Sequence, residues 1–179
     1  YRYLRFVALN EVGGDPGRWS ISVDEFHEGC AKRAEKWPNN LLVATTHDTK
    51  RSGDVRARLL ALSAMAAHWA EAVRHWREDC APLRKGDAPT PAEELLVFQT
   101  VLGAWPISGD RLEEYLVKAL REGKTTSNWL EPDTEHEAAV IAYARALEGH
   151  GPFRFGFDAV VKRAQEIGER RALAATLLR

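Results

Sequence analysis

The sequence has little cysteine, no long hydrophobic run and almost no net charge. Its two cysteines, Cys30 and Cys80, lie far apart without a second cysteine or a histidine at metal-ligand spacing. This pattern predicts neither a zinc site nor a disulfide framework, so we interpret both as reduced thiols of a cytoplasmic protein and expect no metal or other cofactor. No apolar stretch approaches the roughly eighteen residues that span a bilayer, and the N-terminus has no targeting pattern.

The charge balance also excludes some partners. Lys and Arg total 25 against 26 Asp and Glu, which gives no electrostatic footprint for nucleic acid or for an anionic membrane. A neutral polar substrate fits better. With 179 residues, 45% of them hydrophobic, the chain is long enough for a domain with a real apolar core. It lacks an initiator Met and stops in mid-pattern, so we expect an internal piece of a larger protein.

Turn, cap and strand signals divide the first 51 residues. Residues 10–16 form a dense turn signal. Ser22, three residues before Glu25, predicts a capping box that opens an amphipathic helix ending at Pro38. The short apolar run at 41–45 is bounded by polar residues and predicts a strand buried on both faces, the only good strand candidate.

From Ser52 onward the periodicity is helical throughout. A first helix carries an apolar stripe through Leu62, and a weak break at 63–67 follows it. Further helices are expected at about 69–76, 90–103, 112–120, 134–147 and 157–178, with Gly168 a candidate interruption of the last. Residues 124–133 read as irregular. The sequence therefore predicts a mainly α protein.

Six tryptophans are many for this length. Core packing at helical spacing is the favoured interpretation of four of them, namely Trp37, Trp69, Trp76 and Trp105. Trp129 differs, because it ends a polar irregular stretch that begins at Lys124. An exposed aromatic beside hydrogen-bonding side chains would suit a sugar ring. The residues alone favour sugar binding and a structural role of Trp129 equally.

The segment Thr46-His47-Asp48-Thr49-Lys50-Arg51 carries the chemistry, because it places an imidazole, a carboxylate and two cations directly after the predicted strand. Side chains at the C-terminal end of a barrel strand point into the usual active-site face. The carboxylate could serve as a general base, a metal ligand or a stabiliser of a developing cation, and spacing does not rank these roles. In the alternative reading, Asp48 only caps the helix near Ser52 and His47 satisfies a buried backbone group.

Several motifs together resemble one family. In order they are Tyr1-Arg2-Tyr3, Leu9 to Pro16, Phe26-His27, Trp37-Pro38, Thr46 to Arg51, Asp54 to Arg58, and Gln99 to Pro106. Their order and spacing are similar to those of maltooligosyltrehalose synthases, members of the alpha-amylase superfamily (glycoside hydrolase family 13). The family's Lys-x-x-Thr-Ser-Trp pattern keeps Lys124 and Trp129 but departs at Ser127 and Asn128.

The resemblance implies a fold and a division of the chain. Residues 1–51 would be a short piece of a (β/α)8 barrel, one strand and loops with the catalytic loop, completed only in the full-length enzyme. Residues 52–179 would be a helical subdomain inserted after the loop. The barrel needs only one crossover helix there, so we expect the extra helices to wall the substrate pocket.

The resemblance also implies a reaction. A retaining intramolecular transglucosylase would convert the reducing-end alpha-1,4 linkage of a maltooligosaccharide into an alpha,alpha-1,1 linkage, in sequence with a maltooligosyltrehalose trehalohydrolase. Asp48 would be the third catalytic carboxylate, and the substrate-binding residues would be His47, Lys50, Arg51, Lys124 and Trp129. The nucleophile and the acid/base would lie upstream of Tyr1, so the chain alone is expected to be inactive.

Two other readings remain open at this stage. An independent all-helical interaction module would explain the helix count, but it leaves the two motifs at 10–16 and 46–51 without a reason. It would also leave an apolar patch at 41–44 exposed. Another alpha-amylase-type enzyme, such as an amylosucrase or a debranching enzyme, would explain the His-Asp pair, although the surrounding motifs argue against it.

Overall fold

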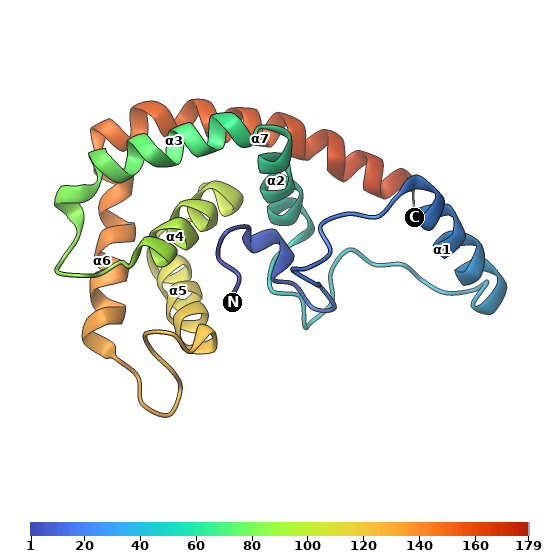
Figure 1. Cartoon of the computed structure of the whole chain (residues 1–179), viewed down its shortest axis with the longest axis horizontal. Coiled ribbons are helices and arrows are strands. Elements are labelled where there is room, and N and C mark those ends of the chain that lie inside the picture. Colours follow the sequence, from blue (N-terminus) through green and yellow to red (C-terminus); the bar gives the residue numbers. More distant parts are fainter. Residues whose placement is uncertain (179) are drawn as a thin grey trace.

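The computed structural model describes residues 1–178 and is mainly helical, which confirms the predicted class (Figure 1). Its α-helices are α1 (Val23–Lys36), α2 (Gly53–Ala64), α3 (Ala66–Asp79), α4 (Pro91–Ala104), α5 (Gly109–Gly123), α6 (Thr134–Gly149) and α7 (Gly151–Leu177). Two short 3-10 helices, η1 (Val7–Leu9) and η2 (Ala81–Leu83), lie in the connections. The irregular segment predicted at 124–133 is the loop between α5 and α6.

Local capping explains where several helices begin. Ser22 accepts from the backbone N–H of Glu25, and the Glu25 side chain accepts from the N–H of Ser22, so the predicted capping box is present. Thr90 and Glu93 form the same box at the start of α4. Ser52 caps α2 through the N–H of Val55. Short-range hydrogen bonds thus set all three starts; the capping boxes at Ser22 and Thr90 are confirmed, whereas the cap of α2 is Ser52 rather than Asp48.

Helix α7 is longer than predicted and passes through Gly168 without a break. It begins at Gly151, where Pro152 occupies the first turn and needs no hydrogen-bond acceptor. Gly168 serves packing instead: a Cβ there would lie 3.0 Å from the backbone nitrogen of Arg58 and 3.1 Å from its Cα. The missing side chain therefore lets α2 and α7 approach closely.

The core draws buried residues from each of the helices α2 to α7, and Figure 1 shows α7 running beside α3 and on past α2. Trp76 of α3 is buried and makes aromatic contacts with Phe98, Phe153 and Phe157. Val7 from the N-terminal segment is fully buried in the same cluster. The first nine residues are thus packed into the helical body.

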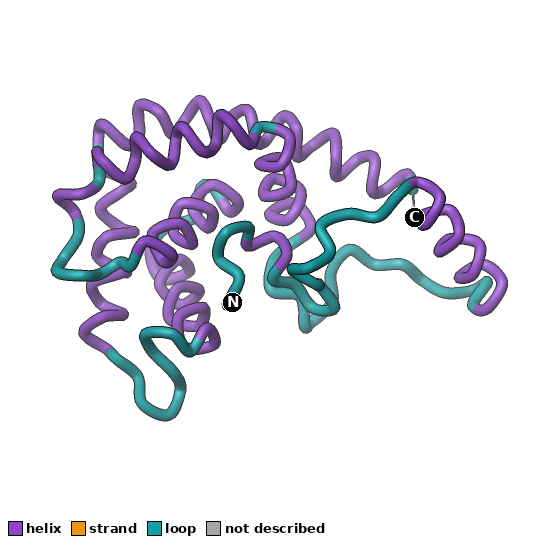
Figure 2. Tube along the Cα trace, viewed as in Figure 1, coloured by secondary structure: helices purple, strands orange, loops and turns teal. Residues whose placement is uncertain are grey.

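The predicted strand at 41–45 is not formed, and no part of residues 1–178 is a strand (Figure 2). Leu41 is 86% exposed and Val43 is 65% exposed. A single strand leaves its backbone N–H and C=O groups unpaired, and the described residues offer no neighbouring strand to satisfy them. The strand predicted from this apolar run is therefore wrong for residues 1–178.

The segment around α1 projects away from the α4–α6 end of the molecule (Figure 1). No residue of α1 is buried, and Trp37 at its C-terminal end is 59% exposed. Core packing was therefore the wrong interpretation of Trp37, whereas Trp76 is buried and Trp69 and Trp105 pack against the core. None of the helices in residues 1–178 is long and apolar enough to cross a membrane.

Candidate functional site

His47 and Asp48 lie at the tip of a tight turn. The carbonyl of Thr46 accepts hydrogen bonds from the backbone N–H and the hydroxyl of Thr49, at 3.2 and 2.8 Å. The hydroxyl oxygen of Thr46 accepts from the N–H of Asp48 at 3.3 Å. Nε2 of His47 lies 3.3 Å from Oδ2 of Asp48, and both side chains are exposed, at 91% and 64%. The turn presents an imidazole and a carboxylate side by side to the outside.

This geometry argues against the purely structural reading of the pair. Ser52 caps α2, so Asp48 does not have that role. His47 is too exposed to satisfy a buried backbone group. Two polar side chains held at a turn tip, with neither used to close the turn, are available for contacts outside the described residues.

Glu11 joins this turn to the N-terminal segment. Its Oε1 accepts from the backbone N–H of Lys50 at 2.8 Å, and its Oε2 accepts from that of Arg51 at 3.2 Å. Burial alone would raise the pKa of Glu11, but the N–H donors of Lys50, Val12 and Arg51 more than offset it, so the pKa lies below its usual value. The Glu11 carboxylate therefore remains charged at neutral pH.

Lys50 and Arg51 do not pair with Asp48. Nζ of Lys50 lies 3.5 Å from the carboxylate of Glu122 and 4.6 Å from the centre of the Tyr1 ring. Arg51 is buried and donates to the carbonyl of Asn10 at 2.9 Å and to the hydroxyl of Tyr115 at 2.7 Å. These contacts favour a positioning role. Substrate binding by either residue stays a prediction.

Lys124 and Trp129 lie on the loop that follows α5. Lys124 is the C-cap of α5 and has a left-handed backbone (φ 55°). Two residues earlier, in the last turn of α5, Glu122 contacts Lys50. The Arg121 guanidinium lies over the Trp129 indole, 5.0 Å from its centre, and Trp129 is 55% exposed. The last turn of α5 thus contacts both the 46–51 segment, through Glu122, and the loop that carries Trp129, through Arg121. Within residues 1–178, however, no direct contact joins Trp129 to His47 or Asp48.

Two buried carboxylates fix this loop from behind. Glu137 of α6 accepts two 2.8 Å hydrogen bonds from Arg121 and one from the hydroxyl of Ser127. Glu93 of α4 accepts from the hydroxyl of Thr126 at 2.6 Å, and it also contacts the ring of His136 at 2.9 Å. The hydrogen bonds from Arg121 lower the pKa of Glu137. The loop that carries Trp129 is therefore anchored through the side chains of Thr126 and Ser127.

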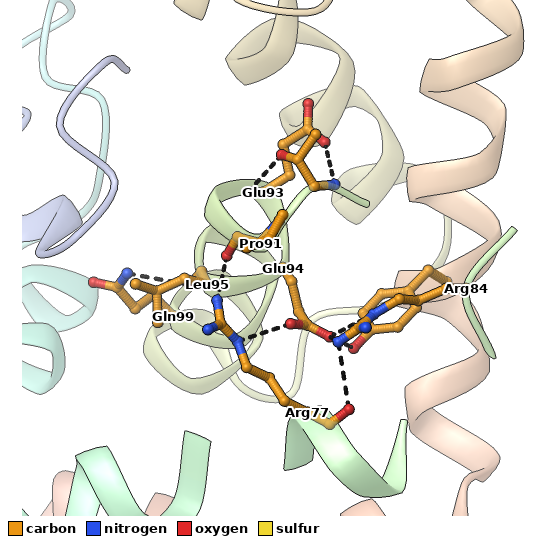
Figure 3. A network of polar contacts seen from close by, with 9 residues as sticks. Arg77, Arg84, Pro91, Glu93, Glu94, Leu95 and Gln99 are labelled. Atoms are coloured by element: carbon orange, nitrogen blue, oxygen red, sulfur yellow. Dashed lines mark hydrogen bonds and ion pairs between the residues drawn. The ribbon is translucent and has the colours of Figure 1, made fainter. Parts of the chain in front are cut away.

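A further polar network, shown in Figure 3, was not found from the sequence. Glu94 of α4 has a side chain only 1% exposed, and it pairs with Arg77 at 2.9 Å and Arg84 at 2.8 Å. The Tyr143 hydroxyl donates to it at 2.7 Å, and burial raises the pKa of this tyrosine. Burial also raises the pKa of the nearby Cys80 thiol to about 12. The network joins α3, α4 and α6 through buried Glu94, which favours a structural role.

The comparisons with known proteins agree with the predicted resemblance. No family model matches the chain. A Mycobacterium tuberculosis (strain H37Rv) protein assigned as a maltooligosyl trehalose synthase is 37% identical over 185 aligned residues, which cover 99% of this chain and 23% of that protein.

Solved structures give the same picture. The maltooligosyltrehalose synthase of Arthrobacter ramosus superposes with a TM-score of 0.80 at 34% identity, covering 99% of this chain and 23% of that one. A Sulfolobus tokodaii protein described as a hypothetical maltooligosyl trehalose synthase gives 0.82 at 31% identity, covering 93% and 23%. The chain spans about a quarter of the length of the relatives it matches. In sequence and in fold, this chain is therefore a homologue of one region of the maltooligosyltrehalose synthases.

Proposed function

We propose that this chain supplies the third catalytic carboxylate, Asp48, to a retaining intramolecular transglucosylase. The enzyme would convert the reducing-end alpha-1,4 linkage of a maltooligosaccharide into an alpha,alpha-1,1 linkage. The observation that carries the proposal is the His47–Asp48 pair, exposed at the tip of a turn whose main chain is fixed from behind. The names of the homologues support the same activity.

In this proposal Asp48 is neither the nucleophile nor the acid/base. Retaining glycosidases use one carboxylate to form a glycosyl-enzyme and another to move the proton, through an oxocarbenium-like transition state. Asp48 would bind the hydroxyls of the distorted sugar more tightly as positive charge develops at its anomeric carbon. His47 would bind a neighbouring hydroxyl. Because the other two carboxylates are expected outside residues 1–179, this chain alone should form no product.

The helices after the turn would favour transfer of the glucose over hydrolysis by keeping water out of the pocket. The released glucose must return through its own anomeric hydroxyl, so water has to be kept out of the pocket. The last turn of α5 lies beside Tyr1 and Lys50, and the 124–133 loop follows it directly, so the two segments would wall such a pocket. Trp129, with one face against Arg121, would offer its other face to a sugar ring.

The Asp48→Asn variant of the full-length enzyme tests the proposal. The amide has the same shape, and Asp48 makes no side-chain contact in residues 1–178 except that with His47, so the melting temperature should stay nearly unchanged. Turnover should fall at least about a hundredfold, since a preorganised charge in a closed site is worth roughly 3 kcal/mol or more. We expect His47→Ala to be milder. An Asp48→Asn enzyme that keeps more than about a tenth of the turnover would rule out the catalytic assignment.

A further inference from the structure

The motif at residues 10–14 has no part in the proposed chemistry, yet its glutamate holds the chain directly behind the His47–Asp48 turn. The carboxylate of Glu11 accepts hydrogen bonds from the backbone N–H groups of Lys50 and Arg51, 39 and 40 residues further on. We propose that Glu11 is a positioning residue that sets where the turn presents Asp48. Its effect on turnover rests on the proposed function, whereas its effect on the loop does not.

The main chain of the turn has few other attachments. Thr46 and Thr49 close it through hydrogen bonds within the turn itself. In residues 1–178, the two hydrogen bonds of Glu11 are those that tie the main chain of 46–51 to a distant part of the molecule. The side chains of Lys50 and Arg51 reach elsewhere. Removing the Glu11 carboxylate would leave the turn intact internally but attached only through the side chains of Lys50 and Arg51, so its main chain would be less closely positioned.

Glu11 can hold the turn because its own position is fixed. Its Oε1 also accepts from the N–H of Val12 at 2.9 Å. The carbonyl of the preceding residue, Asn10, accepts from the buried Arg51 side chain, and the Asn10 amide binds the N–H and the carbonyl of Tyr3. Residues 10–11 and 50–51 are thus joined through both main chain and side chain. The His47–Asp48 turn is therefore attached to the N-terminal segment.

The chemistry of the contact requires a carboxylate of this length. Both oxygens of Glu11 accept from N–H groups, and hydrogen bonds to a charged acceptor are stronger than those between neutral groups. Glutamine keeps one acceptor oxygen, but its amide nitrogen would face a backbone N–H, donor against donor. Aspartate keeps the charge but is one methylene shorter. The positive charge of Arg56, whose guanidinium binds the carbonyl of Ala44, also lowers the pKa of Glu11.

Amide hydrogen exchange of the 179-residue chain, followed by NMR, tests the contact itself. In Glu11→Gln the amides of Lys50 and Arg51 should exchange at least about tenfold faster than in the wild type, because each loses a charged acceptor. Glu122→Gln is the matched control: it removes a carboxylate that contacts the Lys50 ammonium and no backbone of the turn. Its exchange rates at the two amides should stay within about twofold. Equal rates in Glu11→Gln and wild type would overturn the proposal.

A titration of the wild-type chain needs no variant and decides the matter if Glu11→Gln fails to fold. The amide proton shifts of Lys50 and Arg51 should follow a single carboxyl group whose pKa lies below the usual glutamate value. Amides that do not respond to this titration would equally overturn the proposal.

The consequence for catalysis is measured in the full-length enzyme. Glu11→Gln should lower kcat at least about tenfold and change KM by less than about threefold. A displaced Asp48 would stabilise the transition state less while changing the binding of the substrate little. The exposed Glu35→Gln on α1 should retain wild-type kcat. Wild-type kcat in Glu11→Gln would refute the positioning role. If Asp48→Asn kept its activity while the exchange result held, the proposed function would fail and the contact would stand.

Discussion

The backbone N–H of Val7 donates a 2.9 Å hydrogen bond to the side-chain oxygen of Gln99, 92 residues further along the chain. The Gln99 amide nitrogen donates in turn to the carbonyls of Leu4 and Leu95. Gln99 is fully buried on α4, so one side chain fixes the path of the N-terminal segment over the helices. This segment continues to Glu11, whose carboxylate accepts hydrogen bonds from the candidate site.

Replacing Gln99 with leucine should therefore destabilise the fold. The change leaves the N–H of Val7 and the carbonyl of Leu4 without partners, and unsatisfied buried groups cost about 1–3 kcal/mol each. We expect the free energy of unfolding in urea to fall by at least about 2 kcal/mol. Thr100→Val is the control, because the Thr100 hydroxyl bonds only within α4. It should cost less than about 1 kcal/mol, and an equal loss in both variants would contradict the role of Gln99.

Gly168→Ala should also destabilise the chain, through contact between two helices. The added methyl would lie 3.0–3.2 Å from backbone atoms of Arg58 and Ala57, and backbone yields less readily than a side chain. Overpacking of this kind costs about 1–3 kcal/mol. Gly149→Ala on α6 meets nothing within 4 Å and should be neutral or slightly stabilising. Thermal melts of the two variants check this, and a melting temperature unchanged by Gly168→Ala would show that α2 and α7 can move apart.

Glu137 should make the fold sensitive to acid. Arg121 lowers its folded-state pKa below the ordinary value of 4.5, so the unfolded chain takes up the proton first as pH falls. The stability that this pair contributes is present above pH 4.5 and is lost as the pH falls through the lowered value.

Urea unfolding at neutral pH and at about pH 3 measures this dependence. Glu137→Gln should lose about 2 kcal/mol at neutral pH and show a smaller further loss in acid than the wild type. Glu135→Gln, an exposed residue in the same turn of α6, should keep the wild-type dependence. An unchanged acid dependence in Glu137→Gln would assign the effect to other carboxylates.

Trp129→Ala in the full-length enzyme tests the sugar-stacking hypothesis. If the free face of the indole binds a sugar ring, KM for maltooligosaccharides should rise about tenfold, in line with the loss of one aromatic contact. Stability should change little, because the side chain is 55% exposed. Trp37→Ala removes a similarly exposed tryptophan from α1 and should leave KM unchanged. Equal effects of the two substitutions would remove Trp129 from the proposed pocket.

Local patterns in the sequence were sufficient for most of the helices. Capping residues such as Ser22 and Thr90 act on N–H groups three residues away, so their effect can be read without knowing the fold. The His47–Asp48 pair could also be located in advance, because the family resemblance depends on the order of residues alone. The apolar run at 41–45 predicted a strand that the described residues do not form, since strand pairing needs a partner from elsewhere.

Only the tertiary structure decided which side chains support the site. Lys50 and Arg51 follow Asp48 in sequence, yet they contact Glu122 and Tyr115 rather than Asp48. Glu11 and Gln99 stand in motifs that carry the family resemblance, but those motifs did not indicate their contacts, because their hydrogen-bond partners lie 39 and 92 residues away. A buried polar side chain must satisfy its groups with whatever packing brings near, and that neighbourhood is set by the whole fold. The sequence by itself determined the helices and the position of the His-Asp pair, and long-range packing determined what holds that pair in place.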